Sequence, residues 1–450
     1  MPDMADPLFL SYYGDDFTGS TDVMEALASR GVETVLFLRV PDDALLQRFA
    51  HCRAIGLAGT SRSETPDWMD AQLRPVFEWL KARQAMVCHY KVCSTFDSAP
   101  AVGNIGRAIE IGLDVFRQDV APLVVGAPQL RRYTAFGHLF AGYQNDVFRI
   151  DRHPVMSRHP VTPMNEADLT LHLRRQTDLP VALADLTSLT DAGVDARLAA
   201  MTGKGILMLD VDGPDTQKAA GVQLLRLAER GSRFMAGSSG IEYALLQAWQ
   251  TEGRVEGKRH FPSPGPADRI AVVSGSVSPT TERQIRQATG FDGFDGVPLD
   301  PLELLGENGE PAMRRAIEAA EAGLAAGRSV ILHTALGPGA DRGSEIDRVA
   351  GSRHRLGQML GRILLQLIET QTLSRAVIAG GDTSSHALGA LKVDALTTLL
   401  PLPETPGSPL CTAHGLHAPT NGLQIALKGG QVGRDGYFAQ IRDGHAIAAG

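Results

Sequence analysis

The chain has 450 residues, of which 43% are hydrophobic and 21% charged, and its formal net charge is −8. This length exceeds what one ordinary hydrophobic core accommodates, so two large domains are expected. The negative charge excludes a broad electrostatic footprint for nucleic acid or for an acidic membrane surface. No run approaches about 18 apolar residues, so no membrane-spanning helix is expected. Together with the negative charge, this means that neither nucleic acid nor a membrane is expected as a partner.

The four cysteines are Cys52, Cys88, Cys93 and Cys411, and none of them forms a C-x-x-C spacing. In a chain of this size, so few unpatterned cysteines favour reduced thiols over a disulfide framework. The sequence therefore predicts a cytoplasmic protein.

Short β-branched runs alternate with longer helical patterns through the first half of the chain. Strands are expected at "LFLSYY", "VETVLFL", "AIGLAG", "MVCHYKV" and "APLVVGAP", with helices around 66–84 and 104–117 among them. Near-continuous apolar strands separated by helices are typical of a parallel sheet that is covered on both faces. The predicted fold class is α/β, with a largely parallel sheet flanked by helices.

A stretch rich in glycine, proline and charge, "GRVEGKRHFPSPGPADR" at 253–269, interrupts this alternation. It has no apolar periodicity, which indicates a linker. The alternation then restarts with "RIAVVSGSVSPTTERQI". The sequence thus predicts a first domain over 1–252, a linker over 253–267 and a second α/β domain over 268–450.

Two adjacent acids, Asp15 and Asp16, follow the first predicted strand in "GDDFTGSTD", residues 14–22. One acid would suffice for a chain reversal, so the pair suggests chemistry. Asp16 is the candidate base that accepts a proton from an attacking hydroxyl, or a residue that helps hold Mg²⁺, and Asp15 is the second catalytic candidate. In the alternative reading, Asp22 caps the helix with Glu25 while the pair only forms an Asx turn.

Further polar residues follow other strands at the same predicted edge. Arg62 as a bidentate fork and Lys91 as a point charge are suited to hold a substrate carboxylate. The candidate substrate-binding residues are Thr18, Ser61, Arg62, Lys91, Ser94, Thr95, Asp97 and Asn104.

The second domain repeats a strand followed by a glycine-rich turn four times. Carboxyl ends of parallel strands meet at one edge, where glycines let backbone N–H groups approach an anion and helix N-termini add positive partial charge. Such turns also occur without a ligand, but four on one edge favour a polyphosphate site, most simply for ATP. We expect Thr280 or Thr281 to open the first helix. The candidate nucleotide-binding residues are Ser274, Ser276, Gly337, Gly339, Gly380, Gly381, Asp382, Thr383, Lys428, Gly429 and Gly430.

Other motifs in the sequence give weaker evidence about function. No G-x-x-x-x-G-K-[ST] sequence is present, which argues against a P-loop nucleotidase. His414 and His417 in "HGLH" have no evident third ligand, so no protein metal site is expected. The segment 151–169, rich in His, Arg and Pro, is either a wall of the sugar site, with Arg152, Arg158 and Asn165 as donors, or an ordinary connection.

With these motifs in place, the sequence resembles the four-carbon acid sugar kinase family. The resemblance rests on "GDDFTGSTD", "SGSVSPTTERQI", "GGDTS" and "LKGGQVG", which follow one another along nearly the whole chain. It implies an ATP-dependent kinase, active with Mg²⁺ on a small sugar acid such as a threonate, erythronate or 3-oxo-tetronate. It implies an N-terminal sugar-binding domain, a C-terminal nucleotide-binding domain and an active site in the interdomain cleft.

Residue by residue, the resemblance implies ATP contacts at Ser276, at "GGDT" (380–383) and around Gly430. It implies sugar-acid contacts around Asp16, Arg62 and Lys91, and it identifies "GSSG" at 237–240 as the segment that closes the first domain.

One stretch departs from the family pattern. Members that act on four-carbon acids read K-x-D-S-T-L-R-G-N, whereas this chain reads "KVCSTFDSAPAVGN" from Lys91 to Asn104. Cys93 stands at the position of the acid, the arginine is missing, and extra residues precede Gly103. The longer loop suits a bulkier or branched acid such as 3-oxo-isoapionate. The alternatives are a non-catalytic nucleotide- or effector-binding protein and an NAD(P)-dependent oxidoreductase. The sequence leaves the oligomeric state open, a homo-oligomer included.

Overall fold

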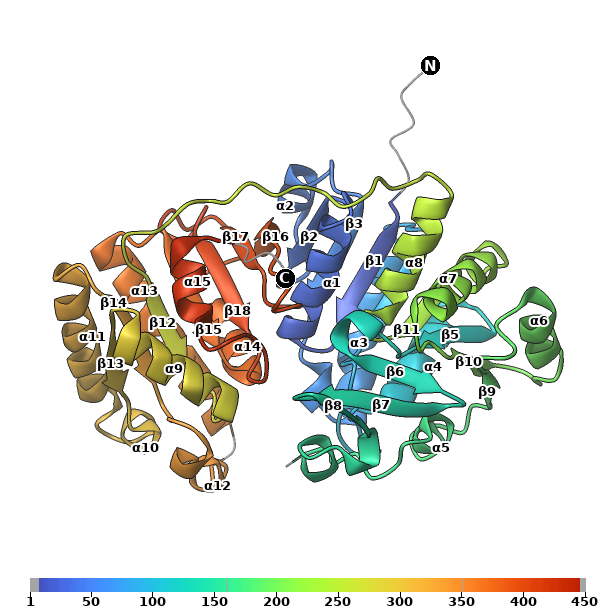
Figure 1. Cartoon of the computed structure of the whole chain (residues 1–450), viewed down its shortest axis with the longest axis horizontal. Coiled ribbons are helices and arrows are strands. Elements are labelled where there is room, and N and C mark those ends of the chain that lie inside the picture. The colour runs from blue at the N-terminus through green and yellow to red at the C-terminus, as the bar shows by residue number, and fades with distance from the viewer. Residues whose placement is uncertain (1–7, 160, 350, 446–450) are drawn as a thin grey trace, which may run out of the picture. The chain divides into compact units, whose positions relative to one another are not determined.

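The computed structural model describes residues 8–159, 161–349 and 351–445, with side chains at 381–385 excepted. The chain divides into two compact units. The first contains the described residues up to Thr34 together with Val40–Arg259, and the second contains Val35–Arg39 together with the described residues from His260 onward. Figure 1 shows both units as sheets flanked by helices.

The sheet of the first unit is parallel throughout and has the strand order β3-β1-β4-β11-β5-β10-β9. The strands are β1 (Leu10–Gly14), β3 (Ala54–Ala58), β4 (Val87–Lys91), β5 (Val120–Val124), β9 (Val181–Ala184), β10 (Gly205–Leu209) and β11 (Phe234–Gly237). The helices are α1 (Phe17–Ala28), α2 (Asp43–Arg48), α3 (Pro66–Lys81), α4 (Ile105–Phe116), α5 (Leu169–Leu173), α6 (Asp191–Ala199), α7 (Pro214–Glu229) and α8 (Gly240–Thr251).

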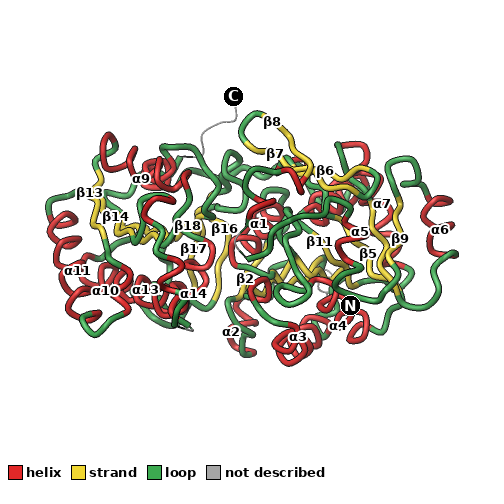
Figure 2. Tube along the Cα trace, turned by 90° about the horizontal axis from the view of Figure 1, so that it is seen from below, coloured by secondary structure: helices red, strands yellow, loops and turns green. Residues whose placement is uncertain are grey.

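Alternating side chains of β1 face two helix layers, since successive residues of a strand point to opposite faces. The Tyr12 hydroxyl donates to the backbone oxygen of Ser20 in α1, whereas the ring of Tyr13 packs edge-on against Phe77 of α3. Helix α3 packs on α4, and α7 packs on α8, which also contacts α1. Figure 2 shows strands between the layer of α3 and α4 and the layer of α7 and α1. Both faces of the sheet are therefore buried, as the apolar strand sequences predict.

A separate antiparallel sheet follows β5 and consists of β6 (Arg132–Ala135), β7 (His138–Tyr143) and β8 (Asp146–Arg149). Phe136 and Gly137, at φ 49° and 78°, form the turn between β6 and β7. The buried carboxylate of Asp210, directly after β10, accepts from the Gly137 N–H at 3.1 Å. The hairpin is therefore fastened to the carboxyl edge of the main sheet.

The second unit has the strand order β13-β14-β12-β15-β18-β17-β16-β2. Its first five strands are parallel, and β17, β16 and β2 continue the sheet antiparallel. The strands are β2 (Thr34–Phe37), β12 (Ala271–Ser274), β13 (Phe294–Pro298), β14 (Ser329–His333), β15 (Arg375–Ala379), β16 (Ala395–Leu400), β17 (Leu410–His414) and β18 (Gln424–Lys428). The segment "VETVLFL", expected in the first sheet, thus pairs through β2 with β16.

The helices of this unit are α9 (Pro279–Phe291), α10 (Pro301–Leu305), α11 (Gly309–Ala325), α12 (Gly343–Ile346), α13 (Ser352–Gln371), α14 (Gly381–Ala390) and α15 (Tyr437–Asp443). One core joins Ile285 of α9 and Phe438 of α15 to Val272 and Ile331 of the sheet. The cap of α9 is Ser278, with Pro279 at its first position, and not Thr280 or Thr281. Proline's fixed φ suits that position, which moves the helix start upstream.

Both units confirm the predicted α/β class with largely parallel sheets. No helix in the described ranges combines the length and apolarity that a bilayer crossing requires.

Candidate active site

Asp16 begins α1 and supplies its cap. The residue is extended, at φ −142° and ψ 165°, and its carboxylate accepts from the backbone N–H of Gly19, with the Thr18 hydroxyl 3.4 Å from Oδ1. The alternative in which Asp22 caps this helix is wrong, because Asp22 lies inside α1 and accepts from the Ser239 hydroxyl. The cap directs the Asp16 carboxylate out of the carboxyl end of the sheet.

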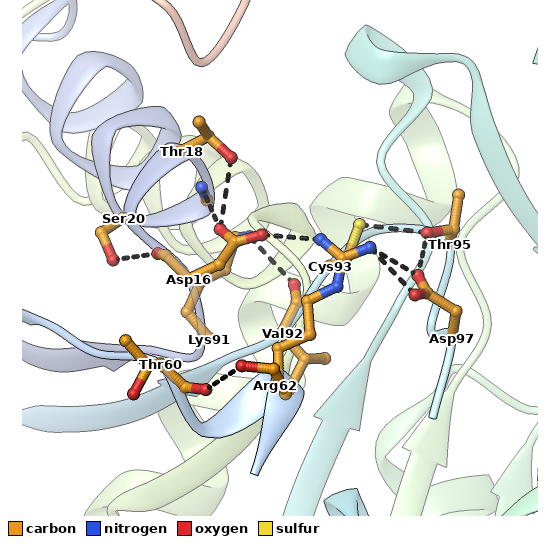
Figure 3. A network of polar contacts seen from close by, with 12 residues as sticks. Asp16, Thr18, Ser20, Thr60, Arg62, Lys91, Val92, Cys93, Thr95 and Asp97 are labelled. Atoms are coloured by element: carbon orange, nitrogen blue, oxygen red, sulfur yellow. Dashed lines mark hydrogen bonds and ion pairs between the residues drawn. The ribbon is translucent and has the colours of Figure 1, made fainter. Parts of the chain in front are cut away.

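Arg62, which follows β3, joins two carboxylates from two other strand ends (Figure 3). Its Nη1 lies 2.6 Å from Oδ2 of Asp16, and its Nη2 lies 2.9 and 3.1 Å from the two oxygens of Asp97. Asp97 is buried, whereas the side chain of Asp16 keeps 20% of its surface exposed. The guanidinium therefore fixes Asp16 without covering it.

The ammonium of Lys91, at the end of β4, is almost fully buried beside the start of α1. A Cβ atom on Gly19 would lie 2.9 Å from Nζ and 2.7 Å from Oδ1 of Asp16, so a larger residue here would displace these two side-chain ends. Burial alone would lower the pKa of Lys91, but the charges of Asp22, Asp15 and Asp16 raise it above its usual value. Lys91 is thus a buried cation that donates to the Val92 carbonyl oxygen at 2.9 Å and whose charge is stabilised by the surrounding carboxyl groups.

The two adjacent acids differ in ionisation. Burial, reinforced by the charge of Asp16, raises the pKa of Asp15 to about 7, and its Oδ1 is buried without a hydrogen-bond partner among the described residues. Burial would also raise the pKa of Asp16, but the charges of Arg62 and Lys91 outweigh it and lower that pKa below the usual value. Near neutral pH, Asp16 is ionised and partly accessible, whereas Asp15 is close to half-protonated and enclosed.

The altered loop after β4 contributes Asp97 and its partners. The Thr95 hydroxyl donates to Oδ1 of Asp97 at 2.5 Å and lies 3.0 Å from Sγ of Cys93. The Thr162 hydroxyl donates to Oδ2 of Asp97 at 3.0 Å. The segment 151–169 therefore reaches this cluster through Thr162, which the sequence analysis did not single out. Of the three donors considered there, Arg152, Arg158 and Asn165, the last accepts from Arg175 through its side-chain oxygen.

Of the predicted substrate-binding residues, the structure brings Thr18, Arg62, Lys91 and Thr95 together with Asp97 around Asp16. Ser94 is half-buried in the same loop. Ser61 is buried against the Tyr90 hydroxyl at 3.1 Å, and Asn104 caps α4 by accepting from the Arg107 N–H at 2.7 Å. The contacts of Ser61 and Asn104 are those of scaffold residues.

In the second unit, hydroxyl groups and a lysine converge after β12 and β18. Nζ of Lys428 donates to Oγ1 of Thr281 at 3.0 Å and to the Gly429 carbonyl oxygen at 2.8 Å. The Ser276 hydroxyl donates to Oγ1 of Thr281 at 3.0 Å, and a Cβ on Gly430 would lie 3.3 Å from Oγ of Ser276. Ser274 is buried beneath this cluster, where its Oγ lies 3.4 Å from the Ser276 N–H.

The neighbouring loops supply glycines. Gly337, at φ 84°, precedes a short 3₁₀ turn that contains Gly339, and Gly380, at φ 114°, donates its N–H to the Lys428 carbonyl oxygen at 2.8 Å. Gly381, Asp382 and Thr383 form the start of α14, but their side chains lie outside the described part of the structure. The strands β12, β14, β15 and β18 are parallel neighbours, so the four loops follow one sheet edge as predicted.

Lys428 is a cation without a carboxylate partner in the described part of this unit. Its side chain is completely buried, and burial lowers its pKa to about 7. Among the described residues, its ammonium donates to hydroxyl and carbonyl oxygens and to no carboxylate, which is costly for a buried charge, and an anion at this edge would compensate it. Backbone amides, hydroxyls and one lysine together make an arrangement suited to phosphate groups.

Comparisons with known proteins agree with both halves of this picture. Residues 10–245 match the sugar-binding N-terminal domain family, and residues 271–438 match the nucleotide-binding C-terminal domain family. A 3-oxo-isoapionate kinase of Paraburkholderia graminis is 43% identical, over 98% of this chain and 96% of that protein. A 3-oxo-tetronate kinase of Methylobacterium radiotolerans is 30% identical, over 97% of this chain and 99% of that protein.

Two solved structures share the fold. A Haemophilus influenzae protein has a TM-score of 0.67 at 22% identity, covering 95% of this chain and 98% of its own. A Salmonella typhimurium protein has a TM-score of 0.72 at 23% identity, covering 96% and 98%. With the kinases among the sequence relatives, the sequence alternatives of a non-catalytic binding protein and an oxidoreductase find no support. The chain belongs to the four-carbon acid sugar kinase family and is an ATP-dependent sugar-acid kinase.

Proposed function

We propose that this kinase phosphorylates a hydroxyl of 3-oxo-isoapionate or of a similarly branched 3-oxo acid. The observation that carries the proposal is the loop after β4, in which both oxygens of Asp97 accept from Nη2 of Arg62. This loop is longer than the pattern of family members that act on four-carbon acids, and it lacks their arginine. The higher identity to the 3-oxo-isoapionate kinase than to the 3-oxo-tetronate kinases supports the same substrate.

Asp16 is the proposed base. Its ionised carboxylate accepts the proton of the substrate hydroxyl as that oxygen bonds to the γ-phosphorus of ATP. The bond between the γ-phosphorus and the bridging oxygen breaks, and ADP leaves with the electron pair. Arg62 positions Asp16 and keeps it ionised, and the neutral or partly protonated Asp15 lies behind it as the second candidate.

In the second domain, the loops after β12, β14, β15 and β18 bind the phosphates of ATP, with Lys428 as the cation and Ser276 as a hydroxyl donor. The support for Lys428 is its complete burial together with a pKa lowered to about 7. A phosphate beside it would restore its charge and repay its burial.

Mg²⁺ enters with the nucleotide in this proposal. In the described ranges no group of three or more His, Cys, Asp or Glu side chains is arranged to hold a metal ion. That fits Mg²⁺, which keeps several waters and is bound largely through substrate phosphates. When bound, it neutralises charge on the β- and γ-phosphates. We further propose a sugar-acid-binding domain over 1–252, a linker over 253–267 and a nucleotide-binding domain over 268–450. A cytoplasmic location is supported by four unbridged cysteines.

The test is ADP release by the purified protein with Mg²⁺, ATP and a panel of acids: 3-oxo-isoapionate, 3-oxo-tetronates, threonate and erythronate. We expect 3-oxo-isoapionate to have the highest kcat/KM, by about 10-fold or more over the four-carbon acids, the size of effect expected when a pocket is shaped for a larger substrate. Reactions without acid give the hydrolysis background. A 3-oxo-tetronate with the highest kcat/KM would contradict the proposed substrate.

A further inference from the structure

The residues first expected to hold the substrate carboxylate are already engaged by the protein. Arg62 donates to Asp16 and to both oxygens of Asp97, and Lys91 is surrounded by Asp15, Asp16 and Asp22. Asp16 and Asp97 already pair with Arg62, and the carboxyl groups of Asp15, Asp16 and Asp22 lie around Lys91, so neither cation is left free for an incoming anion. A sugar acid needs another cation for its carboxylate.

Arg132, the first residue of β6, is such a cation. The antiparallel bridge between Ala127 and Arg132 places it just beyond the carboxyl end of β5, at the same sheet edge as Lys91. Residues 132 and 134 share one face of β6, and on that face Thr134 bonds to Val211 after β10. The side chain of Arg132 therefore faces the main sheet and not the outer side of the hairpin.

The hydrogen bonds of Arg132 leave one edge of its guanidinium unused. Nη1 donates to the carbonyl oxygens of Leu130 and Arg131 at 3.0 and 3.2 Å and approaches that of Gly142 at 3.5 Å. Nε is buried without an acceptor among the described residues. Within those residues, the guanidinium also has no carboxylate partner, at Nη2 or at any other nitrogen. A partly buried guanidinium whose Nε is shielded from water without an acceptor is unfavourable unless a ligand supplies one.

The unused edge has the geometry that binds carboxylates elsewhere in this protein. Arg149 donates from Nε and Nη2 to the two oxygens of Asp151 at 2.7 and 2.8 Å, and Arg353 binds Asp347 through the same two nitrogens. In Arg132, the hydrogen bonds come from Nη1, and the equivalent pair of nitrogens, Nε and Nη2, has no acceptor among the described residues. Planar forks of this kind match a carboxylate bidentately.

Cys93 connects this edge with the catalytic cluster. Burial lowers the pKa of Arg132, and a charge on the Cys93 thiol would raise the pKa of both Arg132 and Arg62. Cys93 thus lies within electrostatic range of both guanidinium groups, but at this position it is a thiol and not a carboxylate. No fixed acid at 93 neutralises Arg132.

We propose that the Nε–Nη2 edge of Arg132 binds the carboxylate of the sugar acid, at the same edge of the sheet as Lys91. This assignment rests on the proposed function and adds the residue that recognises the acid group. It turns the substrate so that its carboxylate lies towards the hairpin and a hydroxyl can lie towards Asp16.

The test compares Arg132→Gln and Arg132→Lys with Arg131→Gln. Arg131 donates to backbone oxygens of Gln144 and Asp146 at the hairpin end, so its variant controls for loss of a neighbouring charge. For Arg132→Gln we expect the KM of the sugar acid to rise by about 10- to 100-fold, the loss typical of one charge-assisted bidentate pair, with the KM of ATP unchanged. Arg132→Lys should recover part of this loss because it restores charge without the fork. Unchanged KM in Arg132→Gln, or an equal rise in Arg131→Gln, would overturn the assignment.

A second measurement uses the neutral amide of the same acid. Wild-type protein should prefer the acid, and Arg132→Gln should lose most of that preference, an outcome that a purely structural role of Arg132 would not produce. Preference for the acid that persists in a folded Arg132→Gln variant would place the carboxylate elsewhere.

If the Arg132 variants fail to fold, the isosteric pair Cys93→Asp and Cys93→Asn tests the same assignment with Arg132 still in place. The aspartate offers a competing carboxylate, so its KM for the acid should exceed that of the asparagine variant by several-fold; equal values would count against Arg132. A wild-type protein inactive on every acid would instead refute the proposed function.

Discussion

Asp16→Asn separates the two roles that the structure gives to this carboxylate. Asn and Asp are similarly good helix caps, so the asparagine oxygen can still accept from the Gly19 N–H and α1 keeps its start. Arg62 loses its 2.6 Å contact with Asp16 but retains both contacts with Asp97. We therefore expect the free energy of unfolding to change by less than about 1 kcal/mol, as for a partly exposed ion pair.

The effect on turnover should be much larger. An amide cannot accept the substrate proton, so kcat should fall by roughly 10²- to 10⁴-fold, which corresponds to about 2.7–5.5 kcal/mol of transition-state stabilisation. The KM of ATP should remain close to the wild-type value, since Asp16 belongs to the other family domain.

The assay is ADP release at saturating acid and ATP, accompanied by thermal unfolding of each variant. Asp16→Ala is the matched variant: its kcat should fall similarly, while loss of the cap lowers its stability by about a further 1 kcal/mol. Turnover of Asp16→Asn within about 10-fold of wild type would refute the assignment of Asp16 as the base.

Three further predictions concern Asp15, Lys428 and Gly103. Burial raises the pKa of Asp15 from the usual 3.8 to about 7, so between these pH values the folded protein binds more protons than the unfolded chain. The free energy of unfolding should therefore fall as pH rises through this window, by up to about 1.4 kcal/mol per pH unit. Unfolding measured at several pH values should show a flatter slope for Asp15→Asn. If kcat also falls as pH drops through about 7, and Asp15→Asn lowers kcat by the roughly 10²- to 10⁴-fold expected for loss of the base while Asp16→Asn does not, Asp15 and not Asp16 is the base. Lys428→Met should raise the KM of ATP by about 10-fold or more, because it removes the cation beside the phosphates. It should also increase thermal stability without nucleotide, because it removes a buried ammonium. A variant with lower thermal stability and weaker ATP binding would contradict the reasoning. The lowered pKa of Lys428 also means that wild-type stability should rise with pH from about 7 towards 10.5, and the variant should lose this rise. Gly103→Ala should destabilise the protein by about 1–2 kcal/mol and raise the KM of the acid. The reason is that Gly103 has φ 61° and that a Cβ there would lie 2.5 Å from the Arg62 carbonyl oxygen. A variant whose stability and KM equal those of the wild type would show that the loop accommodates alanine.

Local sequence was sufficient for much of the fold and for the strand ends where candidate residues lie. Apolar strands between amphipathic helices predict parallel sheets, and parallel sheets bring loops after neighbouring strands together. That reasoning placed Asp16, Arg62 and Lys91 at one edge and Ser276 and Lys428 at another, as the structure has them. The family motifs then indicated the activity, which the comparisons confirm.

Local sequence was insufficient where long-range packing selects between locally acceptable choices. Asp16 and Asp22 are both good capping residues, and the choice of Asp16 depends on where β1 ends and on Arg62 from another strand. The segment at 35–37 reads as an ordinary strand, but its pairing with β16 is a contact across most of the chain.

The charge state of the site is likewise a tertiary property. The sequence determined which acids and bases lie at the strand ends. Only the folded structure decided that Arg62 is occupied by two carboxylates, that Asp15 is buried enough to raise its pKa to about 7, and that the fork of Arg132 is left without a partner. Desolvation and ion pairing depend on distances between residues far apart in the chain, and these distances are not encoded in any local pattern.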